Sequence, residues 1–119
     1  MNTPQQAFYQ QALTAIASVQ QAHNWQEKYR VVMLLGKAMP ALDPTLCTDD
    51  WRVDGCESQG WLIATRAADG TWFLHFDADA RIIKGTIALL LAPLQHQPTS
   101  TILQMDLAQQ YQGLGLTQG

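Results

Sequence analysis

The chain has 119 residues, of which 47% are hydrophobic and 14% charged, and its formal net charge is −3. This length suffices for one domain with its own core and is too short for two ordinary domains. The seven lysines and arginines are scattered along the chain, which argues against a nucleic-acid-binding protein. The longest uncharged apolar run, residues 86–94, is far shorter than the roughly 20 residues that span a membrane. With two cysteines and no visible signal peptide, the protein is expected in the cytoplasm.

Helical patterns fill the first third of the sequence. Thr3 as a cap and Pro4 at the first helical position predict a helix that reaches about residue 21. Asn24 repeats the start signal, and the apolar spacing after it predicts a second helix that stops at Gly36.

The middle of the chain carries the pattern of a sheet. Strands are predicted over residues 51–53, 61–66 and 71–76. Asp69 and Gly70, between the last two, are a favoured hairpin turn. A helix then follows until Pro93, and Thr99 and Asp106 can each cap a short helix. This order predicts an α+β two-layer domain, in which a small antiparallel sheet of about three strands packs with helices.

The candidate reactive residue is Cys56, which follows Gly55 in a polar loop between two predicted strands. Gly55 permits a backbone bend there, and the strand that contains Trp61 supports the loop from behind. The acidic neighbours Asp54 and Glu57 are expected to raise the pKa of the thiol by like-charge repulsion. Such a thiol stays mostly protonated until a partner supplies a base or a positive potential.

Other functions for the thiol remain open at this point. His75 could pair with Cys56 in a free-standing cysteine-dependent transferase or hydrolase, although the pattern favours a solvated strand histidine that faces away from the main apolar side. Cys47 could form a disulfide with Cys56, or a metal site with Cys56 and His75, but the reducing compartment and the spacing argue against both. A pure interaction domain with an incidental cysteine is the remaining possibility.

Several ordered motifs run through most of the chain. They comprise Trp25, Lys28, Tyr29, Leu35-Gly36-Lys37, Val53, Gly55-Cys56, Ser58, Trp61, Asp77, Asp79, Ile82-Ile83-Lys84-Gly85 and Leu114-Gly115-Leu116. Together they resemble the SufE family, which includes CsdE, and the cysteine loop is the most specific part of the resemblance. Gly60 stands where the family usually has valine, and the family's further Ser-x-(Ser/Pro)-Arg-x-x-Gly-Leu segment and final helix have no counterpart before Gly119.

The resemblance implies a single SufE/IscU-like domain over residues 1–119. It also implies that Cys56 takes persulfide sulfur from a pyridoxal-phosphate-dependent cysteine desulfurase of the SufS or CsdA kind, stimulates that enzyme, and passes the sulfur to an Fe–S scaffold or another acceptor. The protein would then be a carrier and activator rather than a stand-alone enzyme, with no cofactor or metal of its own and no nucleic-acid or membrane partner. The implied loop and partner-binding residues are Gly55, Glu57, Ser58, Asp79, Arg81 and Lys84. Asp79 is also expected to stabilise the start of its helix.

Overall fold

The computed structural model describes residues 4–55 and 58–116. Within these ranges the helices are α1 (Pro4–Gln21), α2 (Trp25–Ala38), α3 (Arg81–Leu91), α4 (Thr99–Gln104) and α5 (Leu107–Leu114). The strands are β1 (Arg52–Gly55), β2 (Ser58–Arg66), β3 (Thr71–Ala78) and β4 (Gln97–Pro98), and single 3₁₀ turns cover Pro44–Leu46 (η1), Asp49–Trp51 (η2) and Ala92–Leu94 (η3). The predicted α+β class is confirmed, with a two-residue fourth strand that the sequence pattern did not predict.

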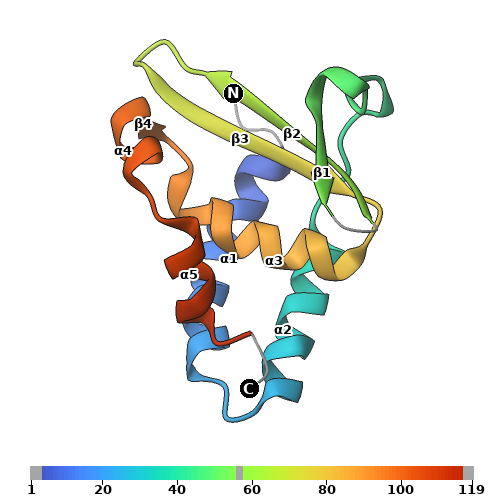
Figure 1. Cartoon of the computed structure of the whole chain (residues 1–119), viewed down its shortest axis with the longest axis vertical. Coiled ribbons are helices and arrows are strands. Elements are labelled where there is room, and N and C mark those ends of the chain that lie inside the picture. The colour runs from blue at the N-terminus through green and yellow to red at the C-terminus, as the bar shows by residue number, and fades with distance from the viewer. Residues whose placement is uncertain (1–3, 56–57, 117–119) are drawn as a thin grey trace.

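The sheet is antiparallel, with the strand order β1-β2-β3-β4. The predicted hairpin joins β2 to β3, and Gly70 takes the positive φ of 87° that its turn requires. Figure 1 shows the sheet along one end of the molecule, with α1 and α3 beneath it and α2 and α5 extending away. Within the described ranges, no helix is long and apolar enough to cross a membrane.

Two of the predicted helix starts are confirmed by their caps. Asn24 and Asp106 each accept a hydrogen bond from a backbone N–H three residues further on, at the starts of α2 and α5. Thr3 lies outside the described residues. Thr99 is the first residue of α4 rather than its cap, and its hydroxyl instead accepts a 2.7 Å hydrogen bond from the Trp72 indole.

The helices α2 and α3 cross at two glycines. The prediction that α2 stops at Gly36 is wrong, because the helix continues to Ala38. A Cβ at Gly36 would overlap with the carbonyl oxygen of Arg81, and a Cβ at Gly85 would overlap with that of Val32. Each glycine therefore lets the backbone of one helix rest on the other, and Gly36 is selected for this close approach rather than for ending the helix.

The strand β3 is buried on both faces. Phe73 packs edge-on against Tyr9 of α1, with 5.9 Å between the ring centroids. His75 shares that face of the strand and packs edge-on against Phe73 at 4.5 Å. The segment between α2 and β1 also crosses this face, where Leu42 is buried. His75 is therefore half-buried rather than solvated, which the one-sided apolar pattern did not predict.

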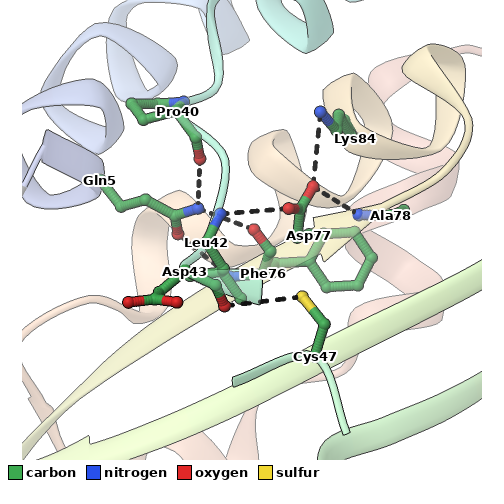
Figure 2. A network of polar contacts seen from close by, with 9 residues as sticks. All are labelled: Gln5, Pro40, Leu42, Asp43, Cys47, Phe76, Asp77, Ala78 and Lys84. Carbon is green, nitrogen blue, oxygen red and sulfur yellow. Dashed lines mark hydrogen bonds and ion pairs between the residues drawn. The ribbon is translucent and has the colours of Figure 1, made fainter. Parts of the chain in front are cut away.

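The outer edge of β3 is paired with β4 at Thr71 and Trp72, and beyond them it is closed by the side-chain amides of two glutamines. The Gln95 amide accepts a 2.8 Å hydrogen bond from the N–H of Leu74 and donates one of 2.9 Å to its carbonyl. The Gln5 amide does the same with Phe76, at 3.1 and 2.8 Å, as Figure 2 shows in part. Both glutamines are buried. Each amide thus takes the place of a peptide group of a neighbouring strand and satisfies backbone groups that would otherwise be buried without partners.

Candidate functional site

Two paired strand ends flank the predicted reactive cysteine. The strands β1 and β2 run antiparallel, and their register places Gly55 opposite Ser58. Cys56 and Glu57 lie between these two residues in the sequence and are outside the described residues, as is the side chain of Ser58. What the described part fixes is therefore the backbone on either side of Cys56, which belongs to the same sheet as β3.

Asp79 is hydrogen-bonded to the start of β2. Its carboxylate accepts a 3.1 Å hydrogen bond from the N–H of Gln59, and its own N–H donates one of 3.0 Å to the carbonyl of Gln59. Gln59 lies three residues after Cys56. The expectation that Asp79 stabilises the start of α3 is not supported, because the cap position is Ala80 and α3 has neither a side-chain cap nor an acidic residue in its first turn. Asp79 instead connects the end of β3 to the strand that leaves the cysteine.

A basic cavity lies next to Asp79, between the end of α2, the end of β3 and the start of α3. Its volume is about 230 Å³. The residues that line it are Gly36, Lys37, Ala78, Asp79, Arg81 and Lys84. Three of the seven basic residues of a chain with net charge −3 thus meet here. The structure brings together Asp79, Arg81 and Lys84, which the resemblance had named, and adds Lys37.

Asp77 is a buried acid that supports one wall of this cavity (Figure 2). Its carboxylate accepts hydrogen bonds from the N–H groups of Leu42, at 3.1 Å, and Ala78, at 2.8 Å. One of its oxygens also lies 3.4 Å from Nζ of Lys84. These contacts hold Lys84 and the segment that follows α2 against the end of β3.

Cys47 lies outside a catalytic or metal-binding group of the described residues. It is a free thiol, and its sulfur lies 4.0 Å from the carbonyl oxygen of Asp43, the weak contact drawn in Figure 2. Burial, with the nearby charges of Asp77 and Asp43, raises the pKa of this thiol, so it is a poor nucleophile. Among the described residues, no group of three or more histidine, cysteine or acidic side chains could hold a metal ion.

His75 lies well along the sheet from the cysteine connection. It is opposite Ile63 in the register of β2 and β3. Ile63 is five residues beyond Ser58, which is about 17 Å of extended strand. The imidazole is 3.4 Å from the Thr65 hydroxyl, and burial lowers its pKa. Its position therefore gives no support to a Cys56–His75 pair, which needs hydrogen-bond contact.

Sequence reasoning missed Lys37, Asp77 and Gln59 as parts of this region. A signal for Lys37 was present, because two glycines within helical patterns are each adjacent to a lysine, in Gly36-Lys37 and Lys84-Gly85. The interpretation of Gly36 as a helix stop concealed it. No sequence pattern indicates Gln59, because its hydrogen bonds to Asp79 are made by its backbone N–H and carbonyl, which any residue has.

Comparison with known proteins gives a consistent result. Residues 14–119 match the SufE family profile, described as an Fe-S metabolism associated domain. An uncharacterised SufE-like protein of Rhizobium etli is 34% identical over 98 residues, which make up 80% of this chain and 66% of that protein. The chain thus spans just under two thirds of the length of this relative.

Proposed function

Because the chain belongs to the SufE family, whose domain is associated with Fe–S metabolism, we propose that it is a sulfur-acceptor protein. Cys56 receives sulfur from the persulfide of a pyridoxal-phosphate-dependent cysteine desulfurase of the SufS or CsdA kind. The protein thereby stimulates the desulfurase and passes the sulfur to an Fe–S scaffold or another acceptor. We place this exchange in the cytoplasm, where thiols stay reduced.

The chemical step is a transsulfuration. The Cys56 thiol loses its proton to a base at the partner's site, and the thiolate attacks the outer sulfur of the desulfurase persulfide. A new S–S bond forms, the S–S bond of the desulfurase breaks, and the desulfurase cysteine leaves as a thiolate that takes up a proton. The step involves no net oxidation, because one persulfide is exchanged for another.

The observation that carries the proposal is the setting of Cys56 within the family match. Gly55 and Ser58, which precede and follow the Cys56-Glu57 pair, are opposite each other at the paired ends of β1 and β2, and Asp79 bonds the start of β2 to the end of β3. A cysteine between two such strand ends can be offered to a partner while the rest of the sheet stays folded. Trp51 and Val53, just before the cysteine, expose 40% and 44% of their surface and offer apolar contact to that partner.

The docking surface in this proposal comprises the cysteine connection and the cavity beside it. Its residues are Gly55, Glu57, Ser58, Asp79, Arg81 and Lys84. Within the described part, Asp79 is bonded to Gln59 of β2 and lines the same cavity as Arg81 and Lys84. A partner that contacts the start of β2 would therefore also meet this cavity.

The test compares two cysteine variants. The protein is incubated with a cysteine desulfurase and cysteine, and its intact mass is then measured. The wild-type protein and Cys47→Ser should gain one sulfur atom that is lost on reduction, whereas Cys56→Ser should gain none while its thermal unfolding is unchanged. Sulfur bound at the wild-type level in Cys56→Ser would overturn the assignment.

A further inference from the structure

The basic cavity beside the cysteine connection owes its composition to the crossing of α2 and α3. Gly36 rests on the backbone of Arg81, and the nearest Arg81 side-chain atom, Cγ, would lie 3.0 Å from a Cβ at Gly36. Gly85 rests on the backbone of Val32. Since Lys37 follows the first glycine and Lys84 precedes the second, the crossing brings both lysines and Arg81 to one cavity.

Two of these three cations have no acidic partner within residues 4–55 and 58–116. Lys84 lies 3.4 Å from a carboxylate oxygen of Asp77. For Lys37 and Arg81, no ion pair or hydrogen bond of the side chain occurs among the described residues, and both side chains are exposed. Asp79, the acid among the described lining residues, accepts a hydrogen bond from the N–H of Gln59 and keeps its negative charge. Within the described residues, the three cations of the lining therefore outnumber the carboxylates of Asp79 and Asp77 beside them, and the cavity has an excess of positive charge.

The backbone at the start of α3 adds to this positive potential. The helix is 11 residues long, its first turn contains no acidic residue, and no side chain caps its first N–H groups. Those N–H groups carry the positive end of the helix dipole. This positive potential adds to that of the cations that line the cavity, which remain its main source.

We propose that this cavity receives one carboxylate side chain, of an Asp or Glu on the partner desulfurase, and that Lys37 and Arg81 bind it. The inference rests on the proposed function and specifies the chemistry of the contact. A volume of about 230 Å³ accommodates one such side chain, and a guanidinium binds a carboxylate through two parallel hydrogen bonds. Because Asp79 joins the cavity wall to the strand after Cys56, a carboxylate bound here fixes the partner next to that strand.

The experiment measures desulfurase turnover as a function of the concentration of this protein. Lys37→Glu and Arg81→Glu should each raise the concentration for half-maximal stimulation about tenfold, equivalent to about 1.4 kcal/mol, and leave the maximal stimulation unchanged. Raising the salt concentration should weaken stimulation by the wild-type protein more than stimulation by the variants. Lys37→Arg, which keeps the charge, should behave as wild type.

Arg30→Glu is the matched control for Lys37→Glu. Arg30 is also exposed and lies on α2 seven residues earlier, which is two turns along the same face and about 10 Å away. It changes the net charge equally and should leave the half-maximal concentration unchanged. Thermal unfolding of every variant shows whether the fold is kept, since Lys37 also lies in the last turn of α2, where a cation favours the helix.

Two results would overturn this inference. One is a half-maximal concentration that rises equally in Lys37→Glu and Arg30→Glu. The other combines two measurements. Sulfate, exchanged for chloride at constant ionic strength, would bind to the wild-type protein but not to Lys37→Glu, while Lys37→Glu would stimulate the desulfurase as well as the wild-type protein does. That combination would show that the cavity binds a free anion rather than a carboxylate of the partner. In both cases the wild-type protein would still acquire sulfur on Cys56, whereas failure of the proposed function would abolish that mass increase.

Discussion

The two long margins of the sheet are held in different ways. The outer edge of β3 is closed by the buried amides of Gln5 and Gln95, which come from distant parts of the chain and make hydrogen bonds of 2.8–3.1 Å to β3. The opposite margin is β1, a strand of four residues, and Trp51 just before it and Val53 within it are exposed. Outside the strand ladder, the described bonds at the start of β2 are those between Asp79 and Gln59.

This difference indicates where the molecule can move without unfolding. Regions with buried, fully satisfied hydrogen bonds open only at a free energy close to that of global unfolding, whereas exposed regions with few contacts open more easily. The margin that carries the cysteine is of the second kind. The proposed sulfur transfer would benefit from this arrangement, because a partner could rearrange the strands that flank the cysteine while the β3 side keeps its structure.

The largest expected effect comes from breaking the closed edge. Gln5→Leu removes the amide and leaves the N–H and the carbonyl of Phe76 buried without partners, which should lower the free energy of unfolding by about 3 kcal/mol. Chemical denaturation measures this loss. The control is Gln10→Leu, an exposed glutamine on the same helix. A loss no greater than in that control would show that the edge does not depend on the amide.

At the other margin, a substitution should affect sulfur transfer more than stability. Asp79→Ala removes the carboxylate that accepts the Gln59 N–H, an exposed hydrogen bond worth about 1 kcal/mol. We expect the rate of sulfur transfer to Cys56 to fall severalfold more than the folded fraction falls. Asp79→Asn keeps an acceptor oxygen and should stay close to wild type in both measurements. A loss of transfer strictly in proportion to lost folded protein would make Asp79 a purely structural residue.

The comparison also separates what the sequence predicts from what it leaves out. Features that depend on neighbouring residues, such as the Asn24 and Asp106 caps and the Asp69-Gly70 hairpin, are confirmed. Gly36 was misinterpreted because a glycine that ends a helix and a glycine on which another backbone rests look alike in sequence. Only the contact with Arg81 tells them apart.

The candidate site follows the same division. The cysteine loop is evident from its local motif. The cavity, in contrast, forms only where two helices meet, and the hydrogen bond between Gln59 and Asp79 involves the backbone of Gln59, which any residue has. The glutamine closure of β3 joins residues 71 positions apart in the case of Gln5 and Phe76. No local pattern distinguishes a glutamine with such a partner from an exposed one.

A gain in stability is expected at Tyr9, in the core beside β3. Its ring is buried, and among the described residues its hydroxyl has no hydrogen-bond partner. Tyr9→Phe keeps the edge-on contact with Phe73 and removes the unsatisfied hydroxyl, so the free energy of unfolding should rise by about 1 kcal/mol. Tyr29→Phe, at an exposed position, should change it little. Destabilisation by Tyr9→Phe would show that the hydroxyl does have a partner.

The smallest effect concerns the pH dependence that His75 adds to the closed side of the sheet. Burial lowers the pKa of the folded-state imidazole, while the unfolded chain keeps a value near 6.5. Above about pH 6.5 the imidazole is neutral in both states and contributes nothing. As the pH falls below that value, the unfolded chain binds a proton that the folded protein resists, so stability is lost until the pH passes below the folded-state pKa.

Urea denaturation at about pH 8 and pH 5 should therefore show a smaller loss for His75→Gln than for the wild-type protein. His23→Gln, at an exposed position before α2, should lose as much as wild type. An equal loss of unfolding free energy in His75→Gln and the wild-type protein would mean that the folded protein tolerates the charged imidazolium. A solvent-accessible position would allow this, whereas a buried one would not.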